Sequence, residues 1–182
     1  MGTPAHWPDD LCCDTLPAAA TRQADAPLSN APAQYRSSGQ RGTPSPFGAD
    51  ARRVKAHKLR REVDVHFTPL ACTVQTAEGI VHAAPGDAIV TGTAGERWRV
   101  SRTHFAERYR PIAPTQPGES GRYESLPIQI TALPMNDAFE VLLADGVSLL
   151  KGRAGDWLVD YGDGSLGIVS QAIFATTYAI NG

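Results

Sequence analysis

Apolar and polar side chains alternate along most of the chain after residue 61, which is the spacing of strands that bury one face. Residues 63–67 are the clearest case. A short helix should begin after the N-cap Ser101, because Phe105 and Tyr109 lie four residues apart on one helical face. In the first half, the alternation and the turn residues predict strands over 63–67, 72–76, 80–83, 88–91 and 97–100.

The second half of the chain predicts the same succession of elements. Strands are expected over residues 127–133, 139–143, 147–150, 157–160 and 166–169. Ser170 takes the N-cap position of another short helix, in which Phe174 and Tyr178 are again four residues apart.

Identical residues recur between the two halves at one fixed spacing. Gly86-Asp87 stands sixty-nine positions before Gly155-Asp156, and six further identities share that spacing without a gap. A fixed period indicates repeated structural units. We therefore predict a β-rich α+β fold with two tandem hairpin-hairpin-helix modules. Units of about 60 residues are marginal alone, so the modules should pack together.

The remaining segments read as a leader and a linker. Residues 1–50 hold seven prolines and show neither helical nor strand periodicity, which is typical of a disordered segment. Residues 113–123 are rich in Pro, Gly and Ser. The expected organisation is a disordered leader, a first module, a linker and a second module, over residues 1–50, 51–112, 113–123 and 124–182.

The repeated segment resembles a family of short bacterial and phage proteins named for a PGDYG motif. Its signature is a Gly-Asp pair, an aliphatic strand, a Gly-containing turn, a returning strand and a Phe-x-x-x-Tyr helix, which spans residues 85–109 and 154–178. The eponymous tyrosine is replaced by Ala88 and Trp157, and Ala154 replaces the proline in the second copy. The resemblance implies the fold of the two modules and carries no activity.

A basic cluster precedes the first predicted strand. Such a cluster can bind a nucleic acid, because Lys and Arg side chains that neutralise phosphates release the counterions bound to them. A run of charged residues is also typical of a solvated face. Arg97, Arg99 and Arg102 would extend it, with Trp98 available for stacking. The six residues of the cluster are Arg52, Arg53, Lys55, Lys58, Arg60 and Arg61.

The Gly-Asp pairs are the second candidate site. An Asp after a Gly at the entry to a strand usually bonds nearby backbone amides, so Gly86, Asp87, Gly155 and Asp156 are interpreted as structural turn residues. The alternative is a catalytic role for the two carboxylates.

The sequence gives little indication of a metal site or a cofactor site. His6, Cys12, Cys13 and Asp14 match no established zinc spacing, and the chain has no phosphate-binding glycine loop before a helix. We expect no metal and no cofactor.

The two halves differ in charge and on one strand face. Residues 51–112 carry eleven Lys and Arg against six Asp and Glu, whereas residues 113–182 carry three against eight. Opposite charge favours mutual docking. Where the first half has Arg97 and Arg99, the second has Leu166 and Ile168. This apolar face should be buried by the other module or by a second subunit.

These observations predict a non-catalytic binding or adaptor module whose partner is a protein, either a second copy or another chain. One alternative is a nucleic-acid-associated protein that uses the cluster Arg52–Arg61, and another is an enzyme of unrecognised type around Asp87 or Asp156. Three cysteines form no disulfide framework, and no apolar run has transmembrane length. We expect a cytoplasmic protein that does not associate with membranes.

Overall fold

A computed structural model describes residues 31–181 and confirms a β-rich fold with two short helices. The first part contains β1 (Ala33–Arg36), β2 (Val54–Lys58), β3 (Glu62–Phe67), β4 (Cys72–Gln75), β5 (Ile80–Ala83), β6 (Ala88–Thr91), β7 (Arg97–Val100), α1 (Arg102–Arg108) and β8 (Tyr109–Pro111). The second contains β9 (Gly121–Ser125), β10 (Gln129–Pro134), β11 (Phe139–Leu142), β12 (Leu149–Gly152), β13 (Trp157–Asp160), β14 (Leu166–Val169), α2 (Gln171–Thr177) and β15 (Tyr178–Ile180).

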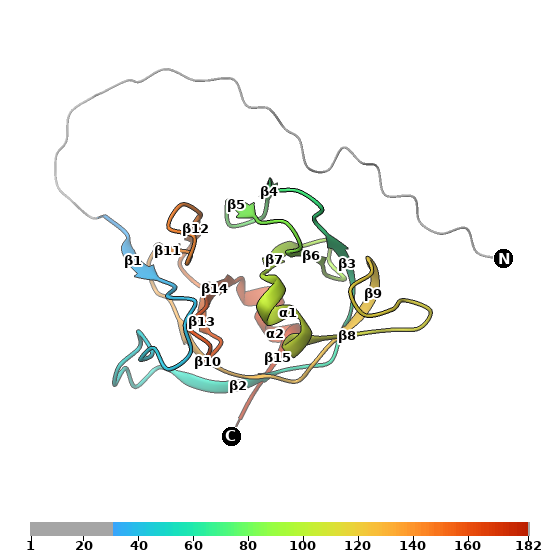
Figure 1. Cartoon of the computed structure of the whole chain (residues 1–182). Coiled ribbons are helices and arrows are strands. Elements are labelled where there is room, and N and C mark those ends of the chain that lie inside the picture. The colour runs from blue at the N-terminus through green and yellow to red at the C-terminus, as the bar shows by residue number, and fades with distance from the viewer. Residues whose placement is uncertain (1–30, 182) are drawn as a thin grey trace, which may run out of the picture.

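Two antiparallel sheets of five strands form the main body. The first sheet has the order β7-β6-β3-β9-β8, and the second sheet has the order β14-β13-β10-β2-β15. Strands β4 and β5 form a separate hairpin, and β11 and β12 form another, to which β1 adds in parallel. In Figure 1 the two sheets lie on either side of the helices.

Each five-stranded sheet contains one strand that the predicted module boundaries do not assign to it. Strand β2 precedes β3 in the chain but pairs with β10 and β15 of the second sheet. Strand β9 precedes β10 but pairs with β3 and β8 of the first sheet. The connections β2–β3 and β9–β10 cross between the two sides at the bottom of Figure 1.

This exchange corrects the boundaries expected from the sequence. Residues 51–112 and 124–182 are not self-contained units. Strand β2 of the first completes the second sheet, and β9, which spans the end of the linker and the start of the second, completes the first sheet. The predicted linker is also too long, since β9 begins at Gly121, inside residues 113–123. A pattern of alternating residues identifies a strand but not its neighbours, so the exchange leaves no trace in the periodicity.

Backbone hydrogen bonds hold the two crossing connections together. The amide of Lys58 donates to the carbonyl of Ile128 at 2.9 Å, and the amide of Ser125 donates to the carbonyl of Arg61 at 2.8 Å. The Ser125 hydroxyl, which is fully buried, donates to the carbonyl of Leu59 and accepts from the amide of Arg61. The polar groups at the crossing are therefore paired without water.

The helices pack on the two sheets through the expected aromatic pairs. Phe105 and Tyr109 stack at 4.9 Å and join the buried cluster of the first sheet, and Phe174 and Tyr178 do the same in the second. Each helix has seven residues. Neither helix among residues 31–181 is long and apolar enough to cross a membrane.

Part of the segment expected to be disordered is ordered. Strand β1 pairs with β11 from Ala33 to Arg36, and the side chain of Phe47 is 4 % exposed in a buried cluster. The prediction of a disordered leader over residues 1–50 is therefore wrong for residues 31–50, and residues 1–30 lie outside the described part. Short strands without alternation, such as Ala33–Arg36, are stabilised by their neighbours rather than by their own pattern.

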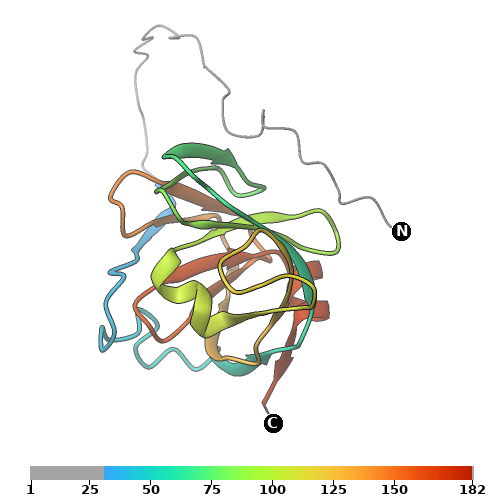
Figure 2. The same cartoon turned by 45° about the vertical axis from the view of Figure 1, so that its right-hand side comes forward.

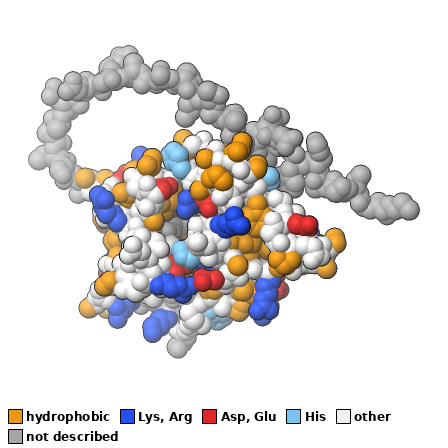
Figure 3. Space-filling view, viewed as in Figure 1, with side chains coloured by type: hydrophobic (Ala, Val, Ile, Leu, Met, Phe, Trp, Pro, Cys, Tyr) orange, Lys and Arg blue, Asp and Glu red, His pale blue; other side chains and the backbone are white. Residues whose placement is uncertain are grey.

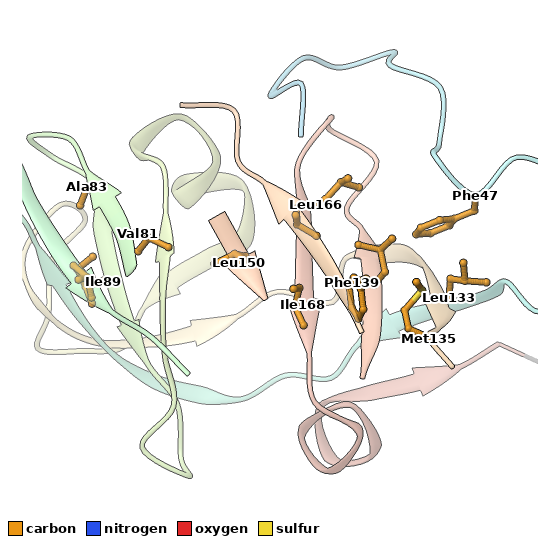
Figure 4. Packing of buried hydrophobic residues seen from close by; sticks show 13 residues of the cluster. Phe47, Val81, Ala83, Ile89, Leu133, Met135, Phe139, Leu150, Leu166 and Ile168 are labelled. Atoms are coloured by element: carbon orange, nitrogen blue, oxygen red, sulfur yellow. The ribbon is translucent and has the colours of Figure 1, made fainter. Parts of the chain in front are cut away.

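A third buried cluster joins the two hairpins to both sheets. Leu166 and Ile168 are buried in it, together with Ile89 of the first sheet. Figure 4 shows Leu150 between the residues around Ile89 and those around Ile168. The apolar face of β14 is thus covered within one chain.

The two hairpins meet at one end of the molecule, as Figure 2 shows. The amide of Lys151 donates to the carbonyl of Glu78 at 2.8 Å, and the amide of His82 donates to the hydroxyl of Ser148 at 2.8 Å. At Gly79 a Cβ would lie 2.8 Å from the carbonyl oxygen of Leu149, so glycine is required for this approach. This contact joins the two hairpins above the two helices in Figure 1.

Candidate binding cleft

A cleft of about 450 Å³ lies between the two sheets. Both sheets, both helices and both hairpins contribute to its lining. In Figure 3 basic, acidic and histidine side chains gather near the middle of the face that is turned to the viewer. The volume falls in the range of small-molecule sites.

The two walls of the cleft differ in chemistry although they are built from the same elements. The wall from β7 and α1 is polar and basic, whereas the wall from β14 and α2 is largely apolar. The first contributes Arg97, Trp98, Arg99, His104, Arg108 and Tyr109, and the residues sixty-nine positions later contribute Leu166, Gly167, Ile168, Ile173, Thr177 and Tyr178. An amphipathic ligand would match this asymmetry.

Lys58 reaches the cleft from β2, the exchanged strand. Its residue is 9 % exposed, and its Nζ donates to the hydroxyl of Tyr109 at 3.1 Å. The same hydroxyl accepts from Nε1 of Trp98 at 3.2 Å. The ammonium lies 5.3 Å from the ring centroid of Trp98 and 5.1 Å from that of Tyr109, which is within cation–π range.

A buried ion pair joins the two walls. The guanidinium of Arg108 on α1 donates to the carboxylate of Asp163, in the turn between β13 and β14, and to the hydroxyl of Ser165 at 2.8 Å. The Ser165 amide and hydroxyl also donate to Asp163. The guanidinium lies 4.5 Å from the ring centroid of Tyr161.

Two groups at this pair have shifted pKa values. Burial acts to raise the pKa of Asp163, but the hydrogen bonds from Ser165 and the charge of Arg108 outweigh it, and the pKa falls below its ordinary value. Burial raises the pKa of Tyr178 well above its ordinary value, and Tyr161 adds to the rise. Near neutral pH Asp163 is therefore ionised, and the hydroxyl of Tyr178, which lines the cleft, is neutral.

Ser101, His104 and Asp163 stand in a row that resembles a catalytic triad. The hydroxyl of Ser101 is 3.1 Å from Nδ1 of His104, but Nε2 of His104 is 3.7 Å from Asp163, which is beyond hydrogen-bond distance. Asp163 is already engaged by Arg108 and Ser165. A carboxylate occupied in this way does not orient the imidazole as a triad requires.

The Gly-Asp pairs form matching turns outside the cleft. Gly86 and Gly155 have φ values of +85° and +91°, which glycine adopts without strain. Asp87 is buried; its carboxylate accepts from the amides of Ala84 and Arg102, and lies 3.5 Å from the guanidinium of Arg99.

Asp87 also caps helix α1. The expected N-cap Ser101 makes no side-chain hydrogen bond to the helix backbone, and the amide of Arg102 is bound by Asp87 instead. In the second sheet Ser170 does cap its helix, and Asp156 accepts from the amide of Arg153. The two turn carboxylates are thus equivalent in position and unequal in their number of partners.

This inequality predicts different costs of neutralisation. Asp87→Asn should lower the free energy of unfolding by about 2 kcal/mol, because a buried carboxylate that accepts two amide bonds beside a guanidinium loses its charge. Asp156→Asn, the matched control, should cost about 1 kcal/mol. Urea unfolding of the two variants measures the difference, and equal losses would contradict the capping role of Asp87.

The side chains of the basic cluster lie in different places in the structure and have different partners. Arg52 pairs with Asp50, Arg60 pairs with Glu124, and Arg61 donates to the carbonyl of Thr176. Arg53 donates to the carbonyl of Gly48, Lys55 is exposed on β2, and Lys58 points to the cleft. The six side chains therefore do not share one free basic surface.

Of the residues that would extend the cluster, Arg97, Trp98 and Arg99 line the cleft and Arg102 does not. Arg97 donates to the carbonyl of Gln75, and Arg99 donates to the carbonyl of His82. Trp98 is partly buried against the core of the first sheet. The metal candidates His6, Cys12, Cys13 and Asp14 lie outside the described residues.

Sequence reasoning missed the buried pair Arg108–Asp163 and the aromatic Tyr161. Asp163 stands between two glycines in a turn, and this setting predicts only a local turn residue. Nothing in it indicates an ion pair with Arg108, which is fifty-five positions earlier in the chain. Lys58 belongs to the predicted basic cluster, but no periodicity distinguishes it from its exposed neighbours.

Comparison with known proteins identifies one related family. A protein-family model described as PGDYG protein matches residues 79–179, from β5 to β15. No curated protein and no solved structure matches the chain.

Proposed function

Because the chain belongs to the PGDYG protein family, whose model spans more than half of it, we propose that it is a non-catalytic binding protein with a small-molecule site between its two sheets. The observation that carries the proposal is the cleft of about 450 Å³. It takes side chains from both walls, and some of them are polar and buried. Sites of this size that are mostly apolar with few convergent polar groups are typical of small ligands.

We propose that the cleft arises from two tandem hairpin-hairpin-helix repeats related by an approximate two-fold axis. Paired hydrogen bonds support this: Leu59 donates to Thr177 and Leu126 donates to Arg108, both at 2.8 Å. The amide of Gly86 donates to Thr68, and that of Gly155 to Met135, both at 2.7 Å. A two-fold axis through the crossing would place the two helices on opposite sides of one central space.

A small ligand replaces the protein partner expected from the sequence. The apolar face of β14, which suggested an interface, is covered inside the chain, with Leu166 and Ile168 buried. The polar groups that remain available converge on an internal space instead of a flat surface. Flat surfaces of larger area are the usual sites of protein association.

The nucleic-acid and enzyme alternatives have weaker support. Nucleic-acid binding would need a continuous basic surface, and Arg52, Arg60 and Arg61 are engaged by partners in different places. A catalytic Asp87 would need a free carboxylate, but both of its oxygens accept backbone amides. We therefore assign the Gly-Asp turns to stability.

The proposal is tested with the full chain and a set of small fragments of different charge. We expect at least one fragment to shift the NMR signals of cleft residues on α1 and α2. Ile173→Trp, on the cleft side of α2, should fill the space and remove these shifts. Ala175→Trp, the control on the exposed side of the same helix, should leave them unchanged.

Two results would overturn the proposed function. One is that no fragment of any charge shifts a cleft signal. The other is that Ile173→Trp, with an unchanged fold by its amide spectrum, binds as the unaltered chain does.

A further inference from the structure

We infer that the ligand of the cleft carries an oxyanion, a carboxylate or a phosphate, and that the ammonium of Lys58 binds it. The inference rests on the proposed binding function and adds the charge of the ligand and the residue that recognises it.

Lys58 has fewer partners than a buried ammonium requires. An ammonium has three N–H donors, and the one hydrogen bond that the structure gives it goes to the neutral Tyr109 hydroxyl. None of the ion pairs between residues 31–181 includes Lys58. Burial of an ammonium without an anionic partner is costly, and an anion that enters the cleft would remove this cost.

The surroundings of Lys58 restrict the position of its ammonium group but do not supply acceptors for its remaining N–H donors. The faces of Trp98 and Tyr109 attract the cation and restrict its position. The Tyr109 hydroxyl already accepts from Trp98 and from Lys58. Since ring faces offer no lone pair in the direction of the cleft, the other donors of Lys58 stay available to a ligand.

Two arginines of the cleft are paired with carboxylates, and Arg97 donates to the backbone carbonyl of Gln75. Arg108 is bound by Asp163, and Arg99 lies 3.5 Å from Asp87. Two acidic residues line the cleft, Glu78 and Glu96, and both belong to hairpin turns rather than to the crossing strand. Burial raises the pKa of Glu78 above its ordinary value. Lys58 is therefore a buried cation of the cleft with no carboxylate partner among residues 31–181, and an anionic ligand would supply one.

The site should occur once per chain. The residue that takes the place of Lys58 at the other crossing strand is Ser125, whose hydroxyl is satisfied by Leu59 and Arg61. The apolar residues Ile128, Val169 and Ile173 line the cleft and could hold an apolar body beside the anionic group. A small aromatic or aliphatic acid, or its phosphate counterpart, fits this arrangement.

The test compares anions with a neutral molecule of the same shape. Benzoate, phenyl phosphate, inorganic phosphate and benzamide are titrated into the full chain, and the indole N–H signal of Trp98 is followed by NMR. Trp98→Phe assigns this signal. We expect benzoate or phenyl phosphate to bind about 10- to 100-fold more tightly than benzamide, as for a hydrogen bond to a charged group.

The variants use two lysines of one strand. Lys58→Met keeps the side-chain stem and removes the charge, and it should reduce the affinity for the anion about 10- to 100-fold towards that of benzamide. Lys55→Met, on the exposed face of β2, should bind the anion as the unaltered chain does. Thermal melting establishes that both variants are folded, and the comparison of anion with benzamide needs no variant.

Each outcome separates the inference from the proposed function. Tighter binding of benzoate than of phenyl phosphate, or the reverse, identifies the carboxylate or the phosphate as the preferred group. If benzamide binds as tightly as the anions, or Lys58→Met keeps full affinity, the inference is wrong and the binding function stands. If neither anions nor benzamide shift the Trp98 signal or any other cleft signal, both are wrong.

Discussion

A fragment of residues 51–112 should be unfolded when it is produced alone, although the sequence presents it as a complete module. It contains β3 without β9, so the first sheet loses its fourth strand and β8 loses the one partner that it has among residues 31–181. It also contains β2, whose partners β10 and β15 are both missing. Tyr123 of β9 is 1 % exposed and packs 5.0 Å from Phe105, so the core of the sheet is lost with the strand.

A fragment of residues 60–125 is the matched control. It has nearly the same length but contains β3, β6, β7, β8 and β9, which are all strands of the first sheet, together with α1. We expect dispersed amide NMR signals for residues 60–125 and collapsed signals for residues 51–112. Cooperative thermal melting of residues 51–112 alone would contradict the exchange of strands.

The second large effect should come from Asp163→Asn. The substitution leaves Arg108, whose side chain is 14 % exposed, without its counter-charge inside the cleft. Breaking a buried pair from one side costs about 3 kcal/mol or more, because the remaining charge is uncompensated. For a chain of this size that corresponds to a fall in melting temperature of roughly 6–12 °C.

Asp145→Asn is the control for this substitution. Asp145 bonds the amides of Val147 and Ser148 and the Ser148 hydroxyl, as Asp163 bonds Ser165, but Asp145 is exposed and takes part in no ion pair among the described residues. We expect Asp145→Asn to cost about 1 kcal/mol. Equal losses in the free energy of unfolding from the two substitutions would show that the ion pair between Arg108 and Asp163 does not stabilise the fold.

The pH dependence of the Asp163 contribution has a definite sign. The pKa of Asp163 in the folded state is below its ordinary value of 3.8, so the unfolded chain binds the proton more readily. The stabilisation is fully present above about pH 4 and is lost as the pH falls through the folded pKa. The difference in stability between the unaltered chain and Asp163→Asn should therefore be constant near neutral pH and shrink in acid.

Elements that depend on near neighbours could be predicted from the sequence. Period-two alternation placed β3, β6, β7, β13 and β14, and the turn residues between them set the hairpins. The spacing of Phe105 and Tyr109, and of Phe174 and Tyr178, placed both helices and the faces that they bury. Positive φ at Gly86 and Gly155 follows from the Gly-Asp turns.

Only the tertiary structure decided which distant segments meet. The pattern predicts neither β2 nor β9 as a strand, and their partners follow from packing rather than from pattern. The exchange carries Lys58 from an apparent surface cluster into the cleft and brings Arg108 to Asp163, fifty-five positions away. Local sequence determines backbone shape because its interactions span a few residues, whereas the burial and pairing of charges depend on contacts that form only when the two sheets close on each other.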